Sequence, residues 1–299
     1  MSDQVKQNKS HQATRQTAHQ GKKVIAKNAT IAVIGAGGMG RAIINGLIRS
    51  KCCYHNQFIV ADHHQEKLDH IARDARVRTT RSAVEALSEK PDVIFICVKP
   101  QSVSDLIDEI GDAIANSLII SIAVGVTLAE LEENFGDGTR IVRAMPTVCA
   151  KVCKSATAVV GGTWATDDDL DLVEELFDAL GVVRLATEKQ LEAVAAVIGA
   201  APAYFALFED TLTRAGILHG LNAPGSREMV NITMEGVAAI LSDSGEHPRA
   251  FCEHVCSPGG TTAYALKEIE PHLEKGVYQA VDAALERSEV LRNGAHNAE

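Results

Sequence analysis

The chain of 299 residues is 46% hydrophobic and 4% aromatic, so it can bury two hydrophobic cores. Its formal net charge is −10 and its sequence pI is about 5.6, and its lysines and arginines do not cluster beyond residue 27. A nucleic-acid partner is therefore not expected, because binding to phosphates requires clustered positive charge.

Cysteine usage and the apolar runs indicate the compartment. The seven cysteines are an odd number and lack the spacing of a secreted disulfide scaffold, which favours reduced thiols. No unbroken apolar run reaches the roughly 18 residues that a membrane helix needs, and the N-terminal stretch lacks the apolar core of a signal peptide. We therefore expect a cytoplasmic protein without a membrane segment.

Residues 1–27 are rich in Gln, Lys, Ser and His and contain hardly any apolar residues. Such a segment cannot offset the entropy that it would lose on ordering, so we expect a flexible arm. A transit peptide is the alternative, although Lys and Gln rather than Arg and Leu dominate the segment.

A glycine-rich turn follows the first apolar run, residues 31–34, and precedes apolar residues at helical spacing. A strand, a glycine turn and a helix in this order form a dinucleotide-binding motif, in which the glycines permit the tight turn, the approach to a pyrophosphate and the packing of helix on strand. A glycine turn without a ligand is the alternative. The residues expected to bind the cofactor are Gly35, Gly37, Gly38, Met39 and Gly40.

The next apolar run, residues 57–61, ends at Asp62, about 20 residues beyond the last glycine. A carboxylate at this position accepts hydrogen bonds from the ribose hydroxyls and repels a 2′-phosphate, which favours NADH over NADPH. His63 and His64 could instead donate to a phosphate, and histidines of a solvated turn are a third interpretation.

Three further apolar runs, 93–98, 118–123 and 140–145, predict parallel strands covered on both faces. The carboxyl ends of such strands face the ligand, so Lys99 either contacts the cofactor or is a solvated lysine at a strand end. From residue 188 the apolar spacing becomes helical almost throughout, and its small Ala and Gly residues suit the close helix packing of a dimer or of a single chain. The fold class is therefore α/β: a Rossmann-type domain with a mostly parallel sheet, 28–187, then an all-α domain, 188–292, and a flexible tail, 293–299.

Between two predicted helices lies the turn Ser257-Pro258-Gly259-Gly260-Thr261-Thr262. The glycines permit unusual backbone angles, and the threonine hydroxyls lie beside the unpaired N–H groups of the second helix, which we expect to end before Pro271. Such a turn can hold a carboxylate, whereas a capped connection between helices is the simpler interpretation.

This turn, together with His247-Pro248 before it and the glycine motif far upstream, resembles the pyrroline-5-carboxylate reductase family from Thr30 to about Arg292. The resemblance implies reduction of a cyclic imine to proline in a homodimer or a larger homo-oligomer. It also implies that Thr262 and Ser257 act on the substrate, with its carboxylate on the turn from Gly259 to Thr262. The further contacts implied with the cofactor come from Val98, Lys99, Pro100, Ala123 and Met145, and many members use NADPH.

Two motifs depart from the family pattern. Where the family continues Met-Pro-Asn-Thr-Pro, this chain has Thr147, Val148 and Cys149 after Met145-Pro146, and where the family has two serines before Pro-Ala-Tyr it has Ile198 and Ala200. These changes keep two alternatives open: a reductase of a different cyclic imino acid, and a nucleotide-binding homologue without catalysis. The pairs Cys149/Cys153 and Cys252/Cys256 are too loosely spaced to predict zinc, so no metal is expected.

Overall fold

The computed structural model describes residues 29–295, which form two compact units divided between Ala186 and Thr187. We call them the sheet unit and the helical unit and describe each by itself. The predicted arm, residues 1–27, lies outside the described residues. Along the chain, the division between the units falls one residue before the predicted boundary. Thr187 belongs to the helical unit because its hydroxyl accepts a hydrogen bond from the backbone N–H of Gln190 and so caps the first helix of that unit.

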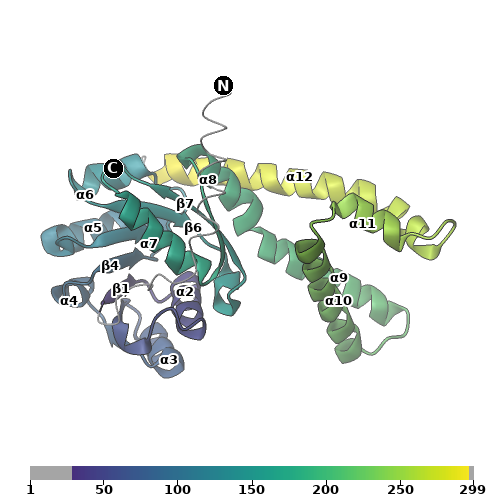
Figure 1. Ribbon diagram of the computed structural model, residues 1–299, viewed down its shortest axis with the longest axis horizontal. Helices are drawn as coiled ribbons and strands as arrows, with labels where there is room; N and C mark the ends of the chain where they lie inside the picture. Colours follow the sequence, from purple (N-terminus) through teal and green to yellow (C-terminus); the bar gives the residue numbers. More distant parts are fainter. Residues whose placement is uncertain (1–28, 296–299) are drawn as a thin grey trace. The chain divides into compact units, whose positions relative to one another are not determined.

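The sheet unit contains an eight-stranded sheet in the order β3-β2-β1-β4-β5-β6-β7-β8 (Figure 1). Among the strands of residues 29–295, β6 and β7 pair antiparallel, whereas the other neighbours pair in parallel. The mostly parallel α/β sheet is therefore confirmed. Its strands are β1 (Ile31–Ile34), β2 (Phe58–Ala61), β3 (Arg78–Thr80), β4 (Val93–Ile96), β5 (Leu118–Ser121), β6 (Ile141–Met145), β7 (Ser155–Gly161) and β8 (Gly181–Leu185).

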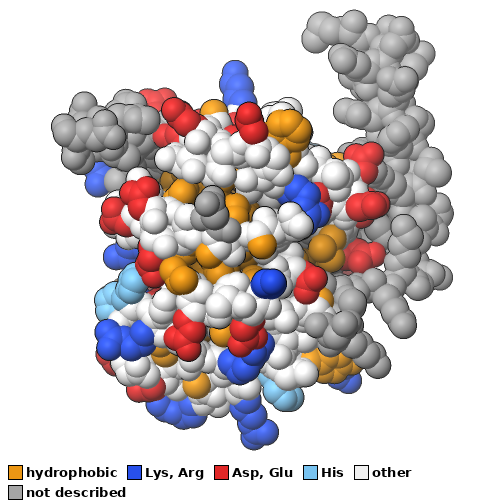
Figure 2. All heavy atoms as spheres, turned by 90° about the vertical axis from the view of Figure 1, so that its left-hand side faces the viewer, with side chains coloured by type: hydrophobic (Ala, Val, Ile, Leu, Met, Phe, Trp, Pro, Cys, Tyr) orange, Lys and Arg blue, Asp and Glu red, His pale blue; other side chains and the backbone are white. Residues whose placement is uncertain are grey.

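Helices cover both faces of this sheet, as the uninterrupted apolar strands require. Ile31 and Val33 of β1 belong to one core with α2 (Gly38–Arg49), α3 (Gln65–Ala75) and α7 (Asp167–Asp178). Their neighbours Ala32 and Ile34 belong to a second core with α4 (Ala83–Ser88), α5 (Val103–Ile110) and α6 (Leu128–Phe135). On the side seen in Figure 2, acidic and basic side chains are interspersed around hydrophobic ones.

The helical unit buries few of its large apolar side chains. Ser226 of α10 donates to the Thr213 carbonyl of α9 at 3.0 Å and joins these two helices, but Leu207 is 66% and Leu218 is 85% exposed. The unit consists of α8 (Glu188–Val194), the π-helical segment η5 (Ala195–Gly199), α9 (Ala201–Leu218), α10 (Ala223–Ser244), α11 (Pro248–Val255) and α12 (Thr261–Ala295). Such extensive apolar exposure indicates a surface that another molecule covers.

One helical stretch in the described residues, Glu188–Leu218, has the length and composition of a membrane helix, and 11% of its most apolar window is buried. The unbroken apolar run within it, residues 193–208, lies between Glu192 and Glu209 and is shorter than the roughly 18 residues that the sequence criterion required. By itself the stretch is weak support for a membrane helix.

The predicted end of the last helix was wrong, because α12 continues through Pro271 to Ala295. A proline removes one backbone hydrogen bond and crowds the carbonyl four residues earlier, which is Lys267. Both Lys267 and Pro271 are exposed, so water can satisfy that carbonyl. Residues 293–295 of the predicted flexible tail are thus helical, and the rest of the tail lies outside the described residues.

Candidate functional site

The predicted cofactor residues gather at one edge of the sheet. The strand order reverses between β1 and β4, which lie side by side in parallel, and ligands of such sheets bind outside the carboxyl ends of the strands at that point. The glycine turn follows β1, Asp62 and His63 follow β2, Val98, Lys99 and Pro100 follow β4, Ala123 follows β5, and Met145 ends β6. Topology therefore brings every predicted cofactor residue to the same edge.

The glycines of the turn divide into two groups. Gly35 has φ +111°, and a Cβ atom there would lie 2.6 Å from the Cys97 carbonyl oxygen; at Gly40 it would lie 2.1 Å from the Gly35 oxygen. The fold itself thus requires these two glycines. A Cβ atom on Gly37 or Gly38 would meet no atom within 4 Å, so packing within the chain explains neither of them.

The open side of Gly37 and Gly38 fits a dinucleotide. Gly37 caps α2 with an extended backbone and, as a glycine, offers no side chain to the N–H groups of this helix start. The N–H groups of the first helical turn have no partner within their helix and carry the positive end of its dipole, which suits a pyrophosphate. Since the absence of side chains lets phosphates approach the backbone, the turn fits a nicotinamide dinucleotide.

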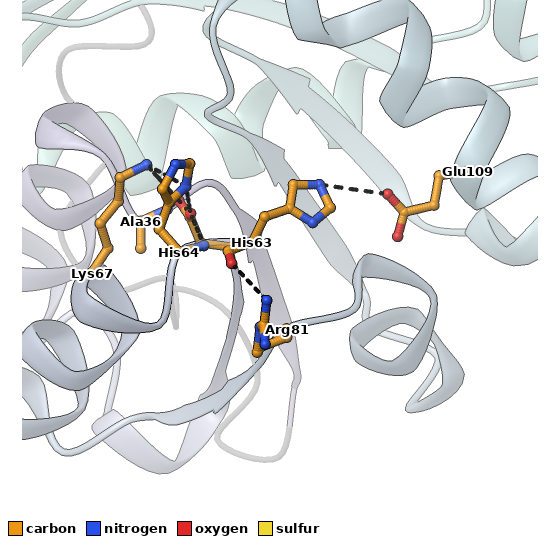
Figure 3. A network of polar contacts seen from close by, with 7 residues as sticks. Ala36, His63, His64, Lys67, Arg81 and Glu109 are labelled. Carbon is orange, nitrogen blue, oxygen red and sulfur yellow. Dashed lines mark hydrogen bonds and ion pairs between the residues drawn. The ribbon is translucent and has the colours of Figure 1, made fainter.

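Asp62 lies in a network that joins the end of β2 to the glycine turn (Figure 3). Its Oδ2 accepts from the Ala36 N–H at 2.9 Å, and its Oδ1 accepts from the His64 N–H at 2.9 Å. The His64 Nδ1 lies 2.9 Å from Oδ1, and the Lys67 Nζ lies 3.3 Å from each carboxylate oxygen. The Asp62 side chain is only 8% exposed, so its oxygens are occupied within the protein.

The pKa of Asp62 reflects this balance. Burial by itself raises the pKa of the carboxyl group, but the hydrogen bonds from His64, from the Ala36 N–H and from Lys67 outweigh burial. Together they hold the pKa below the ordinary value of aspartic acid, because each donor favours the charged form. Asp62 is therefore ionised, and its hydrogen bonds hold this turn in place.

His63 points away from His64 and toward α5 (Figure 3), with its Nε2 3.8 Å from the Glu109 Oε2. Arg81, which follows β3, donates to the His63 carbonyl at 3.3 Å. The sequence predictions missed Lys67 and Arg81. Only the position of Lys67 in the first turn of the helix after Asp62 could have indicated its role.

The loop that departs from the family pattern is a short helical turn, η4 (Val148–Val152), packed on α2. A Cβ atom on Gly46 of α2 would lie 2.3 Å from the Ala150 carbonyl oxygen. Thr147 is buried, and its N–H donates to the Ser155 Oγ at 2.9 Å. Its own hydroxyl lies 3.4 Å from the same oxygen, so Thr147 joins η4 to β7.

In the helical unit, the predicted substrate turn begins with a tight reversal of the backbone. The Gly260 N–H donates to the Ser257 carbonyl at 2.9 Å, and Gly259 has φ +71°. Proline and glycine at the two central positions are typical of a type II turn, which needs positive φ at the second. The Gly260 N–H is thus engaged within the turn itself, and the contact of Gly260 with a substrate carboxylate stays a prediction.

The start of α12 directly after this turn has free hydrogen-bond donors. Thr261 is its first residue, and the N–H groups of a first helical turn lack partners within the helix. In residues 29–295, the hydroxyls of Ser257, Thr261 and Thr262 form no hydrogen bonds with other residues. Arg249 of α11 pairs with Glu270 of α12 and ties the flanking helices together. The helix start can therefore receive a carboxylate.

Ile198 and Ala200 lie in and directly after the π-helical segment η5. Short π-helical segments inside α-helices are frequent at functional sites. Both positions are partly exposed and apolar, so this segment presents no side-chain hydroxyl there. All seven cysteines are free, and no group of three or more His, Cys, Asp or Glu in the described part of the chain is arranged to hold a metal ion.

Comparisons with known proteins match both units. Residues 188–291 match the family model "Pyrroline-5-carboxylate reductase dimerisation", and residues 30–125 match "NADP oxidoreductase coenzyme F420-dependent". The pyrroline-5-carboxylate reductases of Corynebacterium melassecola and Escherichia coli are 32% and 33% identical to the chain. The matches cover 88% and 87% of this chain and 98% and 97% of those proteins.

Solved structures agree with these matches. The pyrroline-5-carboxylate reductase of Coxiella burnetii is 31% identical, with a TM-score of 0.78 over 88% of this chain and 98% of that one. The pyrroline carboxylate reductase of Plasmodium falciparum, solved with NADP bound, is 25% identical, with a TM-score of 0.82 over 90% of this chain and 100% of that one.

Proposed function

The chain belongs to the pyrroline-5-carboxylate reductase family, and on this premise we propose that it reduces 1-pyrroline-5-carboxylate to L-proline. This reaction is the last step of proline biosynthesis, and its reductant is a nicotinamide cofactor. The dinucleotide motif of the sheet unit would bind the cofactor. The substrate turn of the helical unit would bind the imino acid.

The observation that carries the proposal is the start of α12 after the turn Ser257–Gly260. The free N–H groups of Thr261 and Thr262 and the free Ser257 hydroxyl would hold the substrate carboxylate. The positive end of the helix dipole adds to this attraction. A binding module without a substrate would not need such a turn, so its presence favours an enzyme.

The reaction requires the protein to orient the cyclic imine more than to donate a proton to it. A protonated imine is already electrophilic, and when bound the nicotinamide supplies hydride to its carbon, so the product amine keeps the proton of the nitrogen. The Thr262 hydroxyl would bond near the ring nitrogen and fix the face of the ring. The turn and helix start would bind the carboxylate and leave the C=N carbon open to attack.

The expected choice between NADH and NADPH depends on Asp62 at the end of β2. The sequence favoured NADH because a carboxylate at Asp62 could accept from the ribose hydroxyls. In the structure that carboxylate is buried and bonded to Ala36, His64 and Lys67. The preference for NADH therefore stays a prediction from the sequence, and both cofactors are part of the proposal.

We propose further that the exposed apolar surface of the helical unit forms a homodimer interface. This unit matches the dimerisation model of the family, and Leu207 of α9 and Ile232 of α10 are 66% and 63% exposed. A second copy covering α9 also accounts for the apolar stretch Glu188–Leu218 without a membrane. A larger homo-oligomer would assemble from such dimers.

A cytoplasmic location is part of the same proposal. All seven cysteines are free, and the Cys53 thiol donates a hydrogen bond to the Cys52 Sγ at 4.0 Å. Free thiols in this number suit a reducing compartment.

The test is formation of L-proline from DL-1-pyrroline-5-carboxylate by the purified full chain with NADH or NADPH. As a matched substrate, 1-pyrroline has the same ring without the carboxylate, so its reduction should be slower by about tenfold or more. Equal rates for both would refute the role of the helix start. A six-membered cyclic imino acid is the third arm, because apolar Ile198 and Ala200 stand where the family pattern has serine hydroxyls.

A further inference from the structure

We propose that the Ser155 hydroxyl of β7 fixes the loop after β6, residues 145–147, for hydride transfer, and that Ser155 is thus a positioning residue of the reaction. The inference rests on the proposed reductase function and deepens it. Ser155 would act through the backbone of Thr147 and would contact neither cofactor nor substrate. Thr147 is a position where this chain departs from the family pattern, so the contact belongs to this chain.

The loop after β6 lies on the nicotinamide side of the sheet edge. In doubly wound sheets the pyrophosphate lies at the helix that follows the glycine turn after β1, and the adenosine ribose lies at the end of β2. On the other side of β1 the strands follow in the order β4, β5 and β6. The nicotinamide half of the cofactor would therefore extend toward Met145, the last residue of β6.

Thr147 carries the first backbone donor after Met145, because Pro146 has no N–H group. The antiparallel ladder of β6 and β7 ends at the pair Met145–Ala158, and beyond it the Thr147 N–H donates to the Ser155 Oγ at 2.9 Å. The Thr147 carbonyl accepts from the Ala150 N–H at 3.0 Å, where η4 begins. Ser155 therefore holds the backbone at the point where the strand passes into η4.

The Ser155 hydroxyl belongs to a buried group of three hydroxyls. Thr147, Ser155 and Thr157 are 5%, 1% and 4% exposed, and the Ser155 Oγ lies 3.1 Å from the Thr157 Oγ1 and 3.4 Å from the Thr147 Oγ1. Among residues 29–295 the Thr147 N–H has no acceptor besides Ser155. Because a buried donor without a partner is costly, removal of the Ser155 hydroxyl would drive the loop to shift.

Neighbouring elements hold the backbone of Ser155 in place. Its N–H donates to the Leu180 carbonyl at 2.8 Å, and β8 pairs with this end of β7 from Gly181 onward. A Cβ atom on Gly181 would lie 2.1 Å from the Ser155 carbonyl oxygen, so the two strands are in close contact. The hydroxyl therefore projects from a strand that cannot follow a movement of the loop.

The test compares the full wild-type chain with Ser155→Ala in steady-state and single-turnover reduction of DL-1-pyrroline-5-carboxylate, with whichever of NADH and NADPH gives the faster turnover. The single-turnover rate of cofactor oxidation, with enzyme in excess, should fall by about tenfold or more, because hydride transfer tolerates little misplacement. The KM for the cofactor should stay within about threefold, since Ser155 does not contact it. Ser155→Cys, which keeps a side chain of similar size with a weaker acceptor, should show a smaller fall in the same rate.

Ser117→Ala is the matched control, because it removes another buried serine hydroxyl from the sheet unit. The Ser117 Oγ donates to the Pro91 carbonyl at 2.5 Å, before the amino end of β5 and away from the cofactor edge. This variant should keep the wild-type single-turnover rate even if its thermal stability falls as far as that of Ser155→Ala. Thr157→Val removes the hydroxyl on the other side of Ser155 but leaves the bond to the Thr147 N–H, so its rate should stay within about threefold.

The outcomes separate the inference from the reductase function. A Ser155→Ala variant with the wild-type single-turnover rate would overturn the inference and leave the reductase function standing. An equal loss of rate in Ser117→Ala or Thr157→Val would do the same, because it would trace the loss to general destabilisation. A wild type without turnover would overturn both.

Discussion

The Oδ2 atom of Asp62 accepts a hydrogen bond from the backbone N–H of Ala36 at 2.9 Å. This bond fixes the end of β2 to the turn after β1, next to the open side of Gly37 and Gly38. An acidic residue that looks like a ribose ligand in the sequence is therefore part of the framework of the cofactor site.

Asp62→Asn should destabilise the sheet unit at neutral pH by about 1.5–3 kcal/mol, the usual size of hydrogen bonds to a charged group. The folded pKa of Asp62 lies below its unfolded value, so the carboxylate stabilises the fold fully above the unfolded pKa and loses this effect as pH falls through the folded pKa. Urea unfolding at a series of pH values measures the difference. A difference that stays constant down to the lowest pH would contradict the assignment.

Gly37→Ala should lower the affinity for the cofactor, whereas Gly40→Ala should lower the stability of the fold. An added methyl at Gly37 meets no protein atom, and the φ of −70° suits alanine, so stability should stay within about 0.5 kcal/mol while cofactor affinity falls. At Gly40 the methyl would overlap the Gly35 oxygen, and stability should fall by about 1–3 kcal/mol or more. Thermal unfolding and calorimetric titration with NADP⁺ measure the two effects. A Gly37→Ala variant that binds as tightly as the wild type would show that no phosphate lies there.

A charge within the apolar surface of the helical unit should break the homodimer. The wild-type chain should have twice its monomer mass of 31.9 kDa or a larger multiple in multi-angle light scattering, whereas Leu207→Asp should shift it toward the monomer. Val84→Asp is the control, because Val84 is an exposed apolar residue of α4 in the sheet unit. A monomeric wild type, or one that partitions into lipid vesicles, would contradict the proposed interface.

Much of the sheet unit could be predicted because local patterns determine it. The unbroken apolar runs around Val33 and Phe95 specify buried parallel strands, and the glycine spacing specifies the turn after β1. The chain order of strand ends then placed the cofactor residues at one edge without knowledge of any side-chain contact.

What could not be predicted depends on contacts between segments. The bonds of Asp62 depend on where the Ala36 N–H points and on the reach of Lys67, and neither follows from spacing. Pro271 would end an isolated helix, but α12 continues through it. The Gly260 N–H looked free because the sequence shows a glycine turn but not which of its donors the turn itself uses.

The most direct test of the central claim is the initial rate of NADPH and NADH oxidation with DL-1-pyrroline-5-carboxylate, for the wild type and for Thr262→Ala. The Thr262 hydroxyl has no hydrogen-bond partner in the described residues, so its loss should leave thermal stability unchanged. We predict robust wild-type turnover and a fall in kcat/KM of about tenfold or more in the variant. Thr139→Ala, which removes a hydroxyl bonded to the Phe135 carbonyl of the sheet unit, should keep the wild-type rate. A wild type that binds the cofactor without turnover, or a Thr262→Ala variant with the full rate, would contradict the account.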